Sequence, residues 1–177
     1  MEANLMMQTL TSQSHEQNLQ RAISREFRKS LWQGYLTRLV SALIRRDHRL
    51  LDLDQVRQNR EVGSSFEAGI RTVRVGNVRG SEGRIQDFDA GFHPLQEHTR
   101  ARWESVARAW VNDIPLPPVE LVQVGNEYFV RDGHHRISVA RAFGEEAIDA
   151  EITIWDVNRP LPWEKETPMA QLCPEAV

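Results

Sequence analysis

Residues 128–144 read YFVRDGHHRISVARAFG, and this stretch predicts a strand, a tight turn and a helix in immediate succession. Its aromatic and β-branched start favours a strand, and the Asp132-Gly133 pair favours a turn. From His134 the apolar residues follow a helical period that ends at Gly144, a residue type common at helix C-termini. The first turn of this helix therefore carries two histidines and an arginine beside backbone N–H groups that the helix leaves free.

This turn has the chemistry of a phosphate site. Free N–H groups and the positive end of the helix dipole point at one place, and a guanidinium matches phosphate oxygens. We therefore expect Asp132, Gly133, His134, His135 and Arg136 to bind a nucleotide or a phosphorylated small molecule. The alternative is an ordinary Asp-Gly connection with basic side chains in water. Cations at a helix N-terminus are unfavourable without an anion, which favours the first interpretation.

A longer stretch, LPPVELVQVGNEYFVRDGHHRISVARAFGEEAIDAEI, resembles the core of the ParB N-terminal and sulfiredoxin superfamily. The superfamily's hallmark is a strand, a Gly-x-[His/Arg]-Arg turn and a helix, and here the turn is Gly133-His134-His135-Arg136. The resemblance covers about residues 70–155. It implies an α+β fold, a small mixed sheet with packed helices, and it matches Gly133, His135 and Arg136 to phosphate-binding positions of the family.

The branches of this superfamily imply different activities. Sulfiredoxins carry a cysteine where this chain has His134, so sulfinic acid reduction is not expected. ParB proteins carry an arginine where this chain has His135, and they add a helix-turn-helix domain that we do not recognise here. Small-molecule kinases, including a free-serine kinase, have a turn similar to Asp-Gly-His-His-Arg. The resemblance thus implies a nucleotide (ATP, ADP or CTP) and phosphoryl transfer or NTP hydrolysis.

The loop GSEGRIQDFD, residues 80–89, supplies carboxylates for such a reaction. We expect Glu82 to act as the base, because neighbouring glycines let this part of the loop approach a phosphate. Asp87 is the second catalytic candidate. Asp87 and Asp89 alternate in sequence, share one side of an extended segment and are expected to hold Mg²⁺. The alternative is that these acids are solvated or capping residues, with Arg84 paired to one of them.

Residues 1–60 predict a helical extension whose apolar positions recur at helical spacing and whose other face is largely basic. Gly34 predicts a break into two helices. We expect the apolar face, which includes Leu19, Ile23, Phe27 and Leu31, to cover the core. Pairing with a second copy, giving a homodimer, is the next alternative, and contact with a membrane or with DNA follows.

The remaining elements complete the predicted domain, residues 70–157. Residues 61–69 are rich in Gly and Ser and read as a linker, followed by a strand over 70–78 and a helix over 95–111. A hairpin around Gly125-Asn126 and a closing strand over 147–155 complete the sheet. The proline-rich tail, residues 158–177, shows no periodicity.

Composition describes an ordinary globular protein of 177 residues with a formal net charge of −3. That charge gives no general case for binding nucleic acid or a membrane. The first 60 residues nevertheless hold ten Lys and Arg against six Asp and Glu. Together with the resemblance to ParB, this implies an alternative function, a non-enzymatic, ParB-like partition or plasmid-type protein that contacts DNA through the basic helix. The single cysteine, Cys173, and the lack of a long apolar run predict a cytoplasmic protein with no membrane partner.

Overall fold

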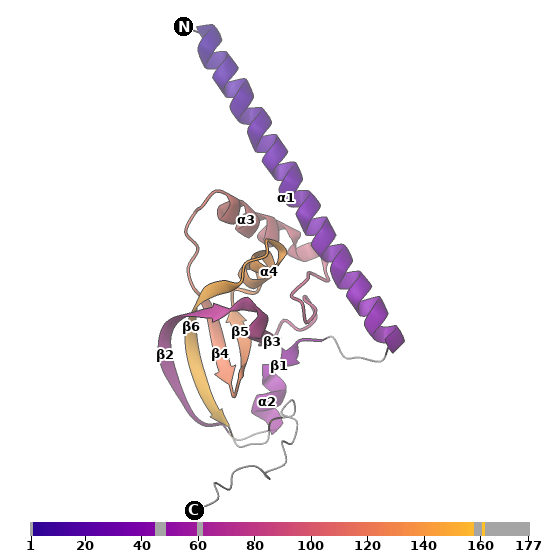
Figure 1. Ribbon diagram of the computed structural model, residues 1–177, viewed down its shortest axis with the longest axis vertical. Helices are drawn as coiled ribbons and strands as arrows, with labels where there is room; N and C mark the ends of the chain where they lie inside the picture. Colours follow the sequence, from indigo (N-terminus) through magenta and orange to yellow (C-terminus); the bar gives the residue numbers. More distant parts are fainter. Residues whose placement is uncertain (1, 45–48, 60–61, 158–160, 162–177) are drawn as a thin grey trace, which may run out of the picture.

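The computed structural model describes residues 2–44, 49–59, 62–157 and 161. Its elements in chain order are α1 (Glu2–Ile44), β1 (Leu51–Asp52), α2 (Leu53–Asn59), β2 (Val62–Arg74), the 3₁₀ turn η1 (Val75–Asn77), β3 (Val78–Ser81), the 3₁₀ turn η2 (Glu97–Thr99), α3 (Arg100–Val111), β4 (Val119–Val124), β5 (Glu127–Asp132), α4 (His134–Ala142) and β6 (Ala147–Val157). The expected hairpin, the helix after Gly133 and the closing strand are confirmed. Figure 1 shows these elements, with α3 and α4 lying between the sheet and α1.

In the described residues, six strands form one mixed sheet in the order β1-β3-β5-β4-β6-β2. β3 runs parallel to β5, with Ser81 opposite Val130, whereas β4 and β5 form an antiparallel hairpin. Parallel neighbours end at the same edge of a sheet. The loop after β3 and the turn after β5 therefore lie side by side, which positions the candidate site. The α+β class with a preceding helical segment is confirmed.

Apolar residues cover both faces of the sheet. Ile137 of α4 packs with Leu121 of β4 in one cluster of buried residues. Val56 of α2 packs with Val122 and Trp155 in a second cluster. Adjacent residues of a strand point to opposite faces, so β4 (VELVQV) serves both clusters. β1 and α2, which fall in the segment predicted as a helical extension, thus join the sheet and its core.

The helix α1 covers the body of the protein through α3 and α4, as expected. Ile23 and Phe27 are 2% and 0% exposed and pack with Trp103 and Val139. The ring of Phe27 meets the ring of Trp103 edge-on, with centroids 5.5 Å apart. The predicted break at Gly34 is wrong, because α1 continues through it. A Cβ at Gly34 would lie 2.8 Å from the Pro94 carbonyl oxygen, so this glycine permits close packing.

Two further boundaries differ from the sequence prediction. The segment 61–69 was expected to be a linker, yet β2 begins at Val62 and pairs antiparallel along β6. Pairing between strands uses main-chain groups, so a polar, Gly- and Ser-containing segment at the edge of a sheet still forms a strand. The strand expected over 70–78 ends at Arg74, where η1 separates it from β3. Among the described residues, no helix is both long enough and apolar enough to cross a membrane.

Replacing Phe27 by alanine tests the contact between α1 and the body. The ring is fully buried, so its loss leaves a cavity and should lower the free energy of unfolding by about 3–5 kcal/mol. Phe66→Ala is the matched control, because that ring on β2 is 55% exposed and should cost about 0.5 kcal/mol. Urea unfolding measures both. Equal stability of the two variants would show that α1 is a free arm.

Candidate anion-binding site

The turn between β5 and α4 depends on Gly133. Its φ of 98° is left-handed, and a Cβ there would lie 2.6 Å from Cγ1 of Val119. Only glycine fits this conformation and this contact without strain. The first backbone bond of α4 runs from the Ile137 N–H to the Gly133 carbonyl, at 3.0 Å. The N–H groups of residues 134–136 consequently lie outside the hydrogen bonds of the helix, at its positive end.

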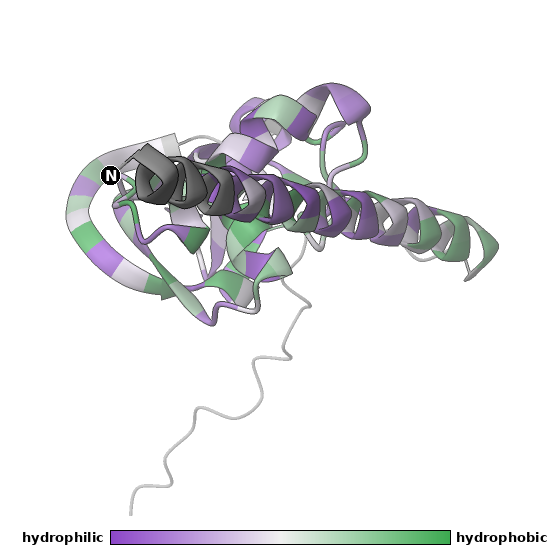
Figure 2. Ribbon diagram, turned by 90° about the horizontal axis from the view of Figure 1, so that it is seen from above, coloured by the Kyte–Doolittle hydropathy of each residue, from purple (hydrophilic) through white to green (hydrophobic). Residues whose placement is uncertain are grey.

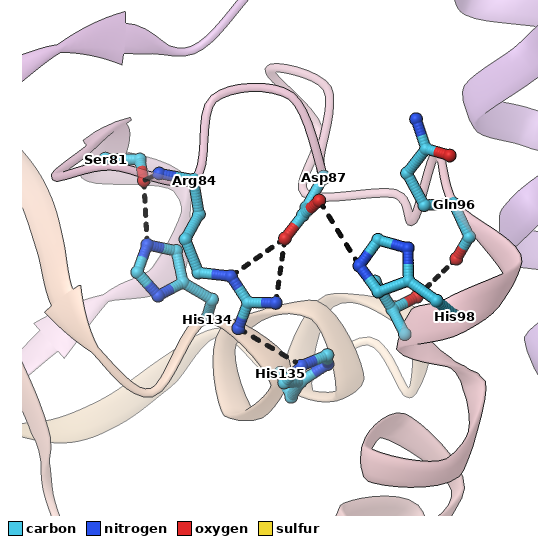
Figure 3. A network of polar contacts seen from close by, with 8 residues as sticks. Ser81, Arg84, Asp87, Gln96, His98, His134 and His135 are labelled. Carbon is cyan, nitrogen blue, oxygen red and sulfur yellow. Dashed lines mark hydrogen bonds and ion pairs between the residues drawn. The ribbon is translucent and has the colours of Figure 1, made fainter.

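A buried hydrogen bond joins this turn to the loop after β3. Oγ of Ser81, the last residue of β3, lies 2.7 Å from Nε2 of His134, the first residue of α4. Both side chains are buried. The Ser81 oxygen also accepts the backbone N–H of Arg84 at 3.2 Å, which shapes the start of the loop. The parallel pairing of β3 and β5 thus brings residues 81 and 134 together, although 53 positions separate them in sequence (Figure 3).

Arg84 lies between a carboxylate and an imidazole in the same network (Figure 3). Its Nε and Nη2 lie 2.9 and 2.7 Å from Oδ2 of Asp87, and its Nη1 lies 3.4 Å from Nε2 of His135. The other carboxylate oxygen of Asp87 lies 3.6 Å from Nε2 of His98. The ring of Phe88 lies against both histidines and beneath the guanidinium. Arg84 keeps 37% of its side chain exposed and is reachable from solvent.

Both histidines of the turn are neutral at pH 7. Burial, with a smaller contribution from the Arg84 charge, lowers the pKa of His134 to about 4. Burial and then the charges of Arg84 and Arg102 likewise lower the pKa of His135 to about 4. Each imidazole therefore has one N–H donor and one acceptor nitrogen. Nδ1 of His135 is buried and has no hydrogen-bond partner among the described residues.

The expected base, Glu82, does not contact this cluster. Its carboxylate oxygens lie 2.9 Å from Nε of Arg131 and 3.4 Å from Nη2 of Arg57. The backbone N–H of Glu82 bonds to the Val130 carbonyl, which continues the β3–β5 ladder by one residue and leaves the side chain beside these two arginines. Asp87, by contrast, belongs to the cluster. The alternative interpretation, in which Arg84 pairs with one acid of the loop, is what the structure shows for Asp87.

Asp89 organises its own loop. Its Oδ1 accepts the N–H groups of Gly91 and His93 at 2.9 and 2.8 Å, and the His93 ring lies 3.0 Å from Oδ2. The side chain of Asp89 is 5% exposed, so it is not open to an ion together with Asp87. Within the described ranges, no group of three or more His, Cys, Asp and Glu residues is arranged to hold a metal ion. Asp87 and Asp89 thus have different hydrogen-bond partners, and the Mg²⁺ site expected at this pair stays a prediction.

Arg136 bonds to Asp132 and to the segment before β4. Arg136 donates hydrogen bonds from Nη1 to the carbonyls of Pro117 and Pro118, and from Nη2 to Asp132. Arg136 also lines an open cavity of about 480 Å³ whose other walls include Trp110 and Ile148. The terminal nitrogens of Arg136 thus hold in place the segment between α3 and β4. The expected contact of Arg136 with a phosphate group stays a prediction, and it would require Arg136 to exchange these partners.

Sequence reasoning did not assign Ser81, Arg84 and His98 to the site. Arg84 and Ser81 belong to the loop that was singled out, but its acids were taken as the functional residues. His98 was separated from the turn by more than 30 residues. One signal in the sequence could have found Ser81 and Arg84. Ser81 ends a strand, Arg84 follows it in the loop, and the histidines follow a second strand. If the two strands are parallel neighbours, both segments lie at one edge of the sheet.

No protein-family model matches the chain, and no curated protein matches it. Among solved structures, sulfiredoxin from Arabidopsis thaliana is similar over 47% of this chain and 82% of that chain. The identity is 13% and the TM-score is 0.37, a likeness that carries no conclusion about activity or ligand.

Acid should destabilise the protein through these two histidines. The unfolded chain takes up protons near the ordinary histidine pKa of 6.5, whereas the folded protein does so only near 4. The free energy of unfolding should therefore be constant above pH 6.5 and fall by a few kcal/mol between pH 6.5 and 4. NMR titration of the imidazole resonances and urea unfolding at several pH values test this. Imidazoles of His134 and His135 that titrate near 6.5 would contradict it.

Proposed function

We propose that the protein binds the phosphate group of a nucleotide or of a phosphorylated small molecule at the cluster of Ser81, Arg84, His134 and His135. The observation that carries the proposal is the contact between Arg84 and His135, where a guanidinium N–H group points at an imidazole nitrogen 3.4 Å away. The buried Nδ1 of the same ring has no partner. Neither form of the neutral ring satisfies both nitrogens.

Each neutral tautomer of His135 leaves one hydrogen-bonding group of the ring without a suitable partner. With the proton on Nδ1, Nε2 accepts from Arg84, but a buried N–H donor stays unsatisfied, which costs about 1–3 kcal/mol. With the proton on Nε2, two donors face each other across 3.4 Å. An anionic oxygen at this position accepts from both Nε2–H and Nη1–H. The hydrogen-bond donors of Arg84 and His135 are therefore better satisfied when an anion is bound than when the site is empty.

Other features of the cluster suit the same ligand. The histidines are neutral, so they add hydrogen-bond donors without repelling the Arg84 charge. The free N–H groups at the start of α4 and the helix dipole favour negative charge at this end. Phosphate, with several oxygens around one centre, can contact the guanidinium, an imidazole and a backbone N–H group together.

Binding of a phosphate group does not by itself give the phosphoryl transfer that the family resemblance implies. Transfer requires a residue that activates the acceptor hydroxyl. Glu82 lies in ion pairs with Arg57 and Arg131, and Asp87 lies in an ion pair with Arg84. Asp87 is the carboxylate that contacts the cluster, and it would reach an acceptor only after releasing Arg84. Mg²⁺, with a nucleotide as ligand, would arrive bound to the phosphates.

Pyrophosphate or ATP should raise the melting temperature of the wild-type protein, and Arg84→Met should remove most of that rise. Ligand at a hundred times its Kd stabilises the folded state by about 2.7 kcal/mol. Each variant is compared with its own ligand-free form, so a change in basal stability does not affect the result. Arg71→Met is the control, because that exposed arginine on β2 lies outside the cluster. An undiminished rise in Arg84→Met, or no rise in the wild type, would refute the site.

Asp87→Asn should strengthen anion binding. Asp87 competes with the ligand for Arg84, so removing its charge frees the guanidinium and should lower the Kd for pyrophosphate roughly 5- to 10-fold. Isothermal titration with and without Mg²⁺ measures the change, with the exposed Asp156→Asn as the control. Weaker binding confined to the Mg²⁺ series would instead identify Asp87 as a metal ligand.

A further inference from the structure

The last three turns of α1 carry a large apolar surface that faces solvent. We infer that this surface binds the same surface of a second copy of the chain, with the two helices antiparallel. Six side chains form it and are called the outer face below: Trp32, Tyr35, Leu36, Leu39, Val40 and Leu43. Their exposed fractions run from 43% for Tyr35 to 82% for Leu43. Figure 2 shows hydrophobic residues concentrated in this end of α1, which projects past the body of the protein.

The outer face lies opposite the part of α1 that packs on its own chain. At 100° per residue, Ile23, Phe27 and Leu31 fall on one side of the helix, and the outer face falls on the other. The first set contacts α3 and α4, so the second set points away from them. Positions 32, 36, 39 and 43 are spaced four, three and four residues apart, which is the a/d spacing of a coiled-coil seam.

The size of the outer face suits a protein partner. From their exposed fractions, the six side chains together present roughly 700 Å² to solvent, against about 800 Å² per partner in a standard interface. The largest apolar patch of a typical monomer is smaller, about 300–600 Å². A second copy presents an equal apolar surface of the same shape, so pairing buries both at once in a two-fold symmetric contact.

Charge on the same helix selects the direction of pairing. Arg21, Arg25, Arg28 and Lys29 are exposed on the same side of α1, immediately before the outer face. Parallel helices would place each of these cations beside its own equivalent, and like charges repel. An antiparallel pair centred between Leu36 and Leu39 sets Trp32 against Leu43 of the second copy. It also carries the two basic segments to opposite ends of the interface.

The mass of the full chain in solution tests the inference. Sedimentation equilibrium at about 100 µM should give twice the 20.4 kDa of one chain. The double variant Leu36→Lys/Leu39→Lys should give a monomer, with a Kd raised roughly 100-fold or more, because two charges from each copy would be buried at the centre. Phe66→Lys/Ile70→Lys is the control, since it replaces equally exposed apolar residues on β2 and should leave the dimer intact.

The direction of helix pairing is measured with a spin label attached to Arg25→Cys in the Cys173→Ser background. Antiparallel helices place the two labels about 39 Å apart, and parallel helices place them within about 15 Å. A monomeric wild type would overturn the inference, as would a dimer that survives Leu36→Lys/Leu39→Lys or a short distance between labels. A monomer that sediments with vesicles containing anionic lipid would overturn it in favour of a membrane surface.

Discussion

The parallel pairing of β3 with β5 is the constraint on which the candidate site depends. It ends two strands at one edge of the sheet, so the loop after Ser81 and the turn at Gly133 meet there. The 2.7 Å hydrogen bond between Ser81 and His134 then fixes loop and helix to each other. Because this bond is buried, it is protected from competition with water, and leaving either group unsatisfied would cost about 1–3 kcal/mol. Arg84 and His135 take their relative positions from it.

Burial shapes the chemistry of the cluster as much as charge does. A protonated imidazole beside Arg84 would be a second cation in a dry environment, and the low pKa values of His134 and His135 follow from that. Two neutral rings next to one guanidinium form a donor-rich but only singly charged site. Asp87 balances this charge, so an anion that bound there would exchange one partner of Arg84 for another.

The same helix serves two purposes at its two faces. The face of α1 that carries Ile23, Phe27 and Leu31 continues the core beyond α3 and α4, and the rings of Phe27 and Trp103 pack edge to face there. The outer face contributes nothing to that core and leaves apolar side chains in solvent. Local sequence does not distinguish the two faces, because both have helical spacing. The position of the body beside one of them does.

Local patterns in the sequence determined the strand, the Gly133 turn and α4, because turn chemistry and hydrophobic period act over a few residues. They also indicated the α+β class and a loop of functional interest over residues 80–89. Only the tertiary structure decided which side chains of that loop reach the turn. Strand pairing selected Ser81, Arg84 and Asp87, directed Glu82 to Arg131, and gave Arg136 to the carbonyls of Pro117 and Pro118. Such partners are distant in sequence, and no local pattern encodes the geometry that brings them within hydrogen-bond distance.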